Sequence, residues 1–337
     1  MQIHELTYSE AKVIYDQLPI EKQITSLSPE YVRLDASREA DCEPLYLSYK
    51  GSQGIGIYSC VKKKAKVNSE CYVVQNPYSY GGELTSSRNL YHEFRRELDR
   101  WFKSNNVIAE TIGRHPILFQ TYDQSYQSSK IIKLPQKQCI AIDFCDHNWS
   151  DYTSRCRNSI RKGMRYGYSC EVLNSSENLD AFMTMYYAAM KKIQASQFYF
   201  FKRNYFENLM SFENCILIVC KQNEVWHSAA LFLLADLYAE YHLAATTLDG
   251  RNNGATNILI DFAAKYFAEK KSKIFYLGGG VTSKSNDPLL KFKSSFSNNK
   301  IYYSREFRIH DQCFIRDEMY KFLPIFDGLE LFLESKN

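Results

Sequence analysis

The sequence predicts an α/β protein of the α+β kind, built from two similar units in tandem. Strand-like and helix-like patterns alternate along all 337 residues. Both halves have the same coarse order of strands, a helix and a further strand, and no low-complexity linker or short repeat separates them. We therefore expect an N-terminal domain over residues 1–146 and a C-terminal domain over residues 147–337.

The individual elements follow from apolar periodicity and turn residues. In the first half, a Gly-Ser-Gln-Gly turn between two apolar runs predicts a hairpin. The expected elements there are strands at 45–49, 55–61, 71–74 and 107–112, and a helix at 88–104. In the second half we expect helices from about 149 to 167, at 179–193, 254–268 and 286–296, and strands at 215–221, 225–235, 238–246, 274–277 and 301–309.

Composition and charge narrow the function classes. A net charge of +4 does not argue for broad nucleic-acid binding, and we expect no DNA partner. It is compatible with an anionic small substrate. No apolar run is long enough to span a membrane, and the N-terminus lacks a signal-peptide pattern. None of the ten cysteines has metal-ligand spacing, so we expect reduced thiols, no metal, and a cytoplasmic protein that could act at the inner face of the membrane.

The most informative segment is IFYLGGGVTSKSNDPLLKFKSSF, residues 274–296. An apolar strand ends in three glycines, which let a backbone approach a ligand where any Cβ would block it. A polar loop then leads into a helix on which Lys293 lies between Phe292 and Phe296. A lysine is an unusual choice on a helix that otherwise faces a core. The alternative is a side chain that reaches from a packed helix to solvent.

A second feature is a row of basic side chains in residues 148–168. Arg157, Arg161 and Arg165 recur every four residues, so their guanidinium groups share one helix face, with Lys162 beside them. A planar guanidinium group binds two phosphate oxygens at once, in a bidentate manner, so the row suits a diphosphate. A solvated basic helix face, which is common, is the alternative.

Taken in order with NPYSYGGEL (76–84) and RHPIL (114–118), these segments resemble the Fem-type peptidyl and aminoacyl transferases and the related acyltransferases of the GNAT superfamily. The resemblance extends from about residue 43 to about residue 310. It implies a fold of two tandem GNAT-like domains, the acyl-CoA N-acyltransferase fold, with mixed sheets flanked by helices.

The resemblance assigns roles to the two segments. Lys293 falls on the family's lysine at the active-site cleft and is expected to be catalytic. A fixed ammonium there can offset the oxyanion that forms when an amine attacks a thioester or ester carbonyl. The basic row resembles the family's R-x-x-I-R-K-A-x-x-x-G element. The residues expected to bind substrate in these segments are Arg157, Arg161, Lys162, Gly278, Gly279, Gly280 and Phe292.

The resemblance also implies donor and acceptor sites. GNAT enzymes place R/Q-x-x-G-x-G/A before a helix whose N-terminal amides hold the pyrophosphate of coenzyme A. Arg251, Gly254 and Ala255 give a partial, shifted match that lacks one glycine. The family's Pro-Tyr-x-Tyr-x-Gly loop falls on Tyr78 and Tyr80, which are expected to contact the acceptor, with a surface turn as the alternative.

These implications predict an enzyme, an acyltransferase that works by direct attack without a covalent intermediate. The favoured donor is acyl-CoA, and the acceptor is an amine of an amino sugar or cell-envelope precursor, as in an N-acetyltransferase of polysaccharide biosynthesis. One alternative is a Fem-type enzyme that uses aminoacyl-tRNA to extend a peptidoglycan precursor. The other is a non-catalytic protein that binds a nucleotide-linked sugar.

Overall fold

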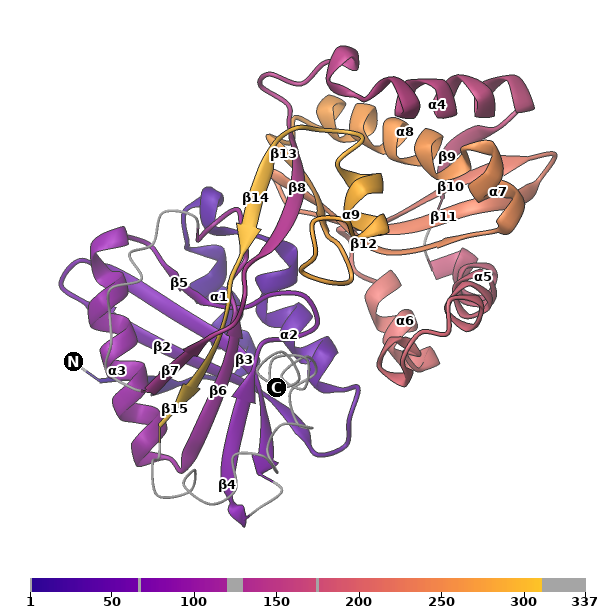
Figure 1. Ribbon diagram of the computed structural model, residues 1–337. Helices are drawn as coiled ribbons and strands as arrows, with labels where there is room; N and C mark the ends of the chain where they lie inside the picture. The colour runs from indigo at the N-terminus through magenta and orange to yellow at the C-terminus, as the bar shows by residue number, and fades with distance from the viewer. Residues whose placement is uncertain (1, 66–67, 120–129, 174–175, 311–337) are drawn as a thin grey trace. The chain divides into compact units, whose positions relative to one another are not determined.

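The computed structural model describes residues 2–65, 68–119, 130–173 and 176–310 (Figure 1). It is a mixed α/β protein with two sheets, and each sheet contains a parallel strand pair as well as antiparallel pairs. Helices flank both sheets, so the expected fold class is confirmed. Among the helices of the described residues, none combines the length and apolar character that a bilayer crossing needs.

The chain divides into two compact units. Unit 1 contains the residues up to Gln136 and from Tyr302 onward, and unit 2 runs from Lys137 to Ile301. This division differs from the expected boundary at 146/147, and sheet pairing is the reason. Strand β8 (Lys137–Asp143) pairs with a strand of unit 2, and β15 (Arg305–Ile309) returns to pair with strands of unit 1. Unit 2 is therefore inserted into unit 1.

Unit 1 is a sheet with strand order β1-β2-β3-β4-β6-β15-β7, and β5 also pairs with β3. The strands are β1 (His4–Glu5), β2 (Cys42–Gly51), β3 (Gly54–Ala65), β4 (Asn68–Gln75), β5 (Glu83–Thr85), β6 (Val107–Gly113), β7 (Lys130–Lys133) and β15. Helix α3 (Tyr91–Ser104) buries Phe94 and Leu98 against Leu47 on one face. Helices α1 (Tyr8–Asp16) and α2 (Pro29–Ala36) pack on the other face, where Tyr46 bonds to the backbone of α2.

Unit 2 is a sheet with strand order β14-β8-β13-β12-β11-β10-β9. Its strands besides β8 are β9 (Ser169–Leu173), β10 (Cys215–Gln222), β11 (Val225–Leu234), β12 (Tyr238–Thr246), β13 (Ile274–Gly279) and the start of β14 (Lys300–Tyr303), whose last two residues belong to unit 1. Its helices are α4 (Ser154–Tyr166), α5 (Leu179–Lys192), α6 (Arg203–Met210), α7 (Leu248–Asn253), α8 (Ala255–Glu269) and α9 (Pro288–Lys293). Helix α8 covers one face of the sheet, and α4 packs on α8 (Figure 1). Helices α5 and α6 lie against the other face.

The two units repeat one arrangement. In unit 1 the parallel strands β4 and β6 are joined through α3, and in unit 2 the parallel strands β12 and β13 are joined through α8. Antiparallel strands flank both pairs. A parallel connection needs a crossover of this kind, so the helix between each pair follows from the topology. The expected order of strands, helix and strand is therefore present twice.

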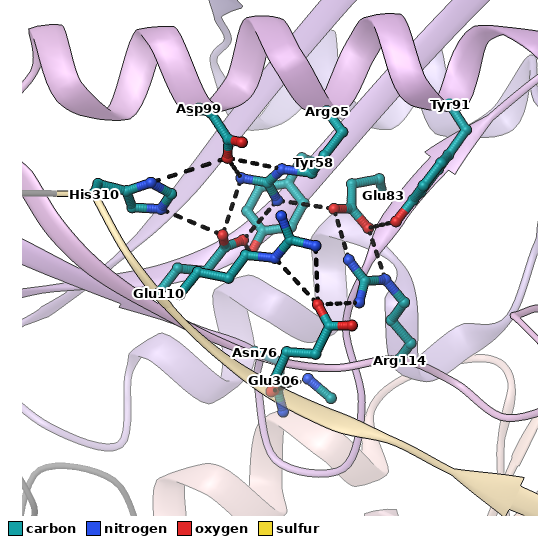
Figure 2. Close-up of polar contacts among 12 residues, drawn as sticks. Tyr58, Asn76, Glu83, Tyr91, Arg95, Asp99, Glu110, Arg114, Glu306 and His310 are labelled. Atoms are coloured by element: carbon teal, nitrogen blue, oxygen red, sulfur yellow. Dashed lines mark hydrogen bonds and ion pairs between the residues drawn. The ribbon is translucent and has the colours of Figure 1, made fainter. Parts of the chain in front are cut away.

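A network of buried ion pairs lies between α3 and the sheet of unit 1 (Figure 2). The Arg95 guanidinium contacts Glu83 at 2.8 Å, Asp99 at 2.6 Å and Glu110 at 2.9 Å. Burial alone would raise the pKa of Glu83, but Arg114 and Arg95 lower it to about 2. Buried charges of this kind are tolerated only when they are paired, so the network fixes α3 in register on the sheet.

Strand β15 supplies the other side of this network. Glu306 accepts contacts from Arg114 at 2.8 Å and Arg308 at 2.9 Å. The imidazole of His310 lies 3.4 Å from Glu110 and 3.9 Å from Asp99 (Figure 2). Those two carboxylates and His310 are close enough together to suggest a metal site. The Arg95 guanidinium, however, already bridges the two carboxylates and takes the place of a cation.

Candidate functional site

The three glycines at the end of β13 allow close packing within unit 2. Gly278 has a φ of +81°, and a Cβ there would lie 3.1 Å from Nζ of Lys293. A Cβ at Gly280 would lie 2.5 Å from Oδ1 of Asp287, and a Cβ at Gly279 would lie 2.9 Å from a carbonyl oxygen of β8. Each glycine thus faces protein atoms. Their absent side chains make room for the lysine and the aspartate of the following loop and helix.

Asp287 fixes the start of helix α9. Its Oδ1 accepts the N–H groups of Leu289 at 2.9 Å and Leu290 at 3.0 Å, and its Oδ2 accepts the N–H and hydroxyl of Thr282. Burial opposes its ionisation, but these hydrogen bonds lower its pKa overall. A charged N-cap of this kind anchors both the loop and the helix. Helix α9 is shorter than the expected 286–296, because it begins at Pro288 and ends at Lys293.

Lys293 projects from the last turn of α9 into the protein. Its residue is 8% exposed, and Nζ donates a hydrogen bond to the carbonyl oxygen of Gly279 at 2.9 Å. Nζ also lies 5.7 Å from the centre of the Tyr241 ring. Burial lowers the pKa of Lys293 to about 8, although Cys139 and Asp287 favour its charged form. The side chain therefore does not reach from the helix to solvent. It is a buried cation with a backbone partner.

The two central strands of unit 2 part beside Lys293. β12 pairs in parallel with β13 from Tyr238 to Glu240. After Glu240, the described residues of β12 pair with β11 and no longer with β13. A bulge interrupts the pairing of β12 with β11 at His242, between Tyr241 and Leu243. Burial lowers the pKa of His242 to about 4, so its imidazole is neutral at pH 7. The ammonium of Lys293 thus lies where the backbone groups of two strands separate.

Phe292 precedes Lys293 on the same helix. Its side chain is half-buried, packs on the core of unit 2 and meets the Phe296 ring edge-on at a centroid distance of 5.3 Å. This packing holds α9 against the sheet and so orients the lysine.

The basic row lies on α4, and its members have separate partners. Arg157 donates to the carbonyl oxygens of Ser150 and Tyr152, just before the helix. Arg161 is exposed and bonds to the side chain of Asn158, while Lys162 donates to a carbonyl oxygen at the end of α7. Among the described residues, none of these three cations has a carboxylate partner. They share a helix but do not converge on one point.

The start of α8 packs against α4. Ala255 is fully buried, and the Cα of Gly254 packs against the carbonyl oxygen of Ser159 on α4, where a Cβ would not fit. The N–H of Gly254 bonds to the carbonyl oxygen of Gly250 within α7. Arg251 is exposed on α7. Thr256 and Asn257 in the same turn are partly exposed, and the assignment of Arg251, Gly254 and Ala255 to a coenzyme A pyrophosphate stays a prediction.

Tyr78 and Tyr80 lie in a loop of unit 1. The Tyr78 carbonyl accepts the hydroxyl of Tyr31 at 2.9 Å, and the next residue, Ser79, has a φ of +97°. The Tyr80 ring packs edge-on to His115 at 4.8 Å and to Tyr303 at 4.9 Å. Both tyrosines are half-buried.

Two features near Lys293 are not evident from the sequence. The bulge at His242 interrupts what reads as one continuous strand, 238–246. Cys139 lies on β8, where a Cβ on Gly279 would meet its sulfur at 3.2 Å. Neither has a local sequence signal, because each depends on which strands become neighbours.

Comparison with known proteins supports the fold. The sequence matches no protein-family model and no curated protein sequence. The structure is similar to that of FemX, with a TM-score of 0.68, 13% identity, and coverage of 94% of this chain and 99% of FemX. It is also similar to the C-terminal DUF2156 domain of a proposed lysylphosphatidylglycerol synthetase from Agrobacterium fabrum, with a TM-score of 0.61, 12% identity, and coverage of 96% and 98%.

A third similar structure is L-PGS from Bacillus licheniformis, with a TM-score of 0.51, 14% identity, and coverage of 78% of this chain and 84% of that one. At these identities the likeness concerns the fold. The resemblance seen in the sequence motifs is thereby confirmed at that level: the chain has the fold of FemX and of the lysylphosphatidylglycerol synthetase domain.

Proposed function

We propose that the protein is an acyltransferase that moves an acyl group from an activated thioester or ester to an amine. The observation that carries the proposal is the environment of Lys293. Its ammonium is buried and fixed by one hydrogen bond to Gly279, which leaves two N–H groups without an acceptor among the described residues. A preorganised charge of this kind stabilises a developing oxyanion.

The proposed reaction needs no covalent enzyme intermediate. The nitrogen of the acceptor attacks the donor carbonyl, and the carbonyl oxygen becomes an oxyanion beside Nζ of Lys293. Collapse of this intermediate breaks the bond to the leaving thiol or alcohol, which takes up the proton that the amine loses. Because its pKa is about 8, Lys293 is mostly charged at pH 7 and can serve in this way throughout the reaction.

The acceptor that we propose is an amino sugar or another amine-bearing precursor of the cell envelope, linked to a nucleotide. Arg161 is the best candidate for a phosphate contact, because its guanidinium is exposed, whereas Arg157 is engaged with nearby carbonyl groups. Tyr78 and Tyr80 belong to unit 1, and their assignment to the acceptor stays a prediction from the sequence resemblance.

Acyl-CoA and an aminoacyl ester are the two candidate donors. An N-acyltransferase of this fold would use the first. The partial match to the GNAT pyrophosphate element at Arg251, Gly254 and Ala255 keeps acyl-CoA as the favoured donor. The name of lysylphosphatidylglycerol synthetase, which describes the joining of a lysyl group to a lipid, supports an aminoacyl ester as the second candidate. An aminoacyl-tRNA would carry such an ester.

A transfer assay tests the proposal and separates the donors. Purified protein is incubated with labelled acetyl-CoA or with charged tRNA, together with a panel of nucleotide-linked amino sugars. We expect transfer from one donor, reduced about 100-fold or more in Lys293→Met. The matched control is Lys291→Met, on the exposed side of the same helix. Equal rates for both variants and the wild type would remove Lys293 from the mechanism.

A further inference from the structure

Lys293 is a buried amine without a carboxylate partner. The residue is 8% exposed, and no carboxylate within the described parts of the chain forms an ion pair with it. Two titratable groups, the thiol of Cys139 on β8 and the carboxylate of Asp287, favour its charged form, but Asp287 is occupied by Thr282 and by the first turn of α9. A buried charge without a counter-charge favours its neutral form. A substantial share of neutral amine near pH 8 follows, in agreement with the lowered pKa.

The position of Nζ would also place it close to the carbonyl carbon of the donor. If Nζ stabilises the oxyanion, it must lie within hydrogen-bond distance of the donor's carbonyl oxygen. The carbonyl carbon is then about one bond length further away. Gly278 keeps a side chain out of the space next to Nζ, since a Cβ there would approach it to 3.1 Å. The group that stabilises the donor is thus also a nucleophile near it.

We propose that Nζ of Lys293 is itself an acylation site, modified by the activated donor when no acceptor amine is bound. The inference rests on the proposed function, which brings the donor carbonyl to this lysine. The neutral amine attacks the carbonyl carbon and forms a C–N bond. The C–S or C–O bond of the donor breaks, and the leaving thiol or alcohol takes the proton that the nitrogen loses. The product amide carries no charge and ends the role of Lys293 as an ammonium.

This reaction would couple activity to acceptor supply. A bound acceptor amine competes for the same carbonyl carbon, so it protects the enzyme. Acylation becomes faster as pH rises towards and above 8, because only the neutral amine attacks. Donor that accumulates in the absence of acceptor would therefore inactivate the enzyme.

The test compares Lys293 with Lys291, which is exposed on the same short helix. Wild-type protein is incubated at pH 7.5 with acetyl-CoA, with charged tRNA, or with acetyl phosphate, a small acyl donor that needs no binding site. Peptides containing both lysines are then quantified by mass spectrometry. With at least one of these donors we expect Lys293 to be acylated on the order of ten-fold faster than Lys291. Lys291→Arg should leave this rate unchanged, and Lys293→Arg should abolish the modification.

The outcomes separate this inference from the proposed function. If the protein transfers acyl groups to acceptors while Lys293 is labelled no faster than Lys291 with every donor, self-acylation is overturned and the transferase proposal stands. If acetyl phosphate labels Lys293 selectively but no acceptor is ever acylated, the reactive amine is supported and the transferase proposal fails. Acceptor added with the donor should slow the labelling of Lys293. If it has no effect, the proposed competition is overturned.

Discussion

Replacing Lys293 with methionine should stabilise the protein while it impairs catalysis. The pKa of this lysine falls from 10.5 to about 8 on folding, mainly through burial. At ~1.36 kcal/mol per pH unit, holding the charge inside the protein costs about 3 kcal/mol below pH 8. Methionine keeps the apolar volume but loses the hydrogen bond to Gly279, which is worth about 1 kcal/mol. We therefore expect the free energy of unfolding to rise by about 2 kcal/mol.

The pH dependence gives the same prediction an independent check. Between pH 8 and 10.5 the folded wild-type protein binds fewer protons at Lys293 than the unfolded chain does, so its stability rises with pH across this window. Lys293→Met should lack that rise. The catalytic rate should change in the opposite direction. Lys293 loses its proton above pH 8, so kcat/KM should fall there as this single group titrates.

Urea unfolding measures the stability of unit 2 when it is followed by tryptophan fluorescence in a Trp101→Phe background, in which Trp149 and Trp226 are the tryptophans that remain. Transfer kinetics from pH 6 to 10 measure the activity. A variant that is less stable than the wild type, or one that keeps its rate, would refute the reasoning. The first result would show that the charge is better solvated than its burial indicates, and the second that the charge has no catalytic role.

Four further variants or conditions test the site and its supports. Gly278→Ala should cost about 1–2 kcal/mol in thermal unfolding, because its φ of +81° is left-handed, and it should lower kcat by displacing Lys293. Asp287→Ala should cost about 1–2 kcal/mol and reduce activity, whereas loss of stability with full activity would separate the cap from catalysis. Arg157→Ala should lower the free energy of unfolding by about 1 kcal/mol, because the carbonyl groups of Ser150 and Tyr152 lose a hydrogen-bond donor. An unchanged melting temperature would show that Arg157 is only a solvated cation. The stability of unit 1, followed by circular dichroism, should fall as pH falls from 4.5 towards 2, because the pKa of Glu83 is about 2 in the folded protein. A stability that does not change with pH in this range would contradict this.

Much of the fold could be predicted from sequence where the pattern is long. The helix at 254–268 and the strands at 225–235 and 238–246 lie within one residue of the observed elements. The short helices α1 and α2 were not expected, although their starts carry signals. Thr7 and Glu10 form a capping box at α1, and Pro29 opens α2. These helices have only nine and eight residues, so apolar periodicity is weak there.

The sequence predicted that Lys293 and the glycines lie near one another, but it did not predict their geometry. The motif places Lys293 near the glycines, and the structure brings Nζ into hydrogen-bond contact with the backbone of Gly279. Which glycine has the left-handed backbone, however, depends on how β13 meets β8. The partners of Arg157 likewise follow from the turn before α4. Side-chain partners across elements cannot be deduced from spacing along one helix.

The insertion of unit 2 into unit 1 has a consequence for biosynthesis. Strand β15 completes the sheet of unit 1 beside β6 and supplies Glu306 to Arg114. During translation, the ribosome releases β15 only after all of unit 2 has emerged. Nascent unit 1 must therefore wait with an open sheet edge and a guanidinium that lacks one of its carboxylates, while unit 2 is continuous and can fold by itself. We therefore expect the usual order, in which the N-terminal unit folds first, to be reversed in this chain.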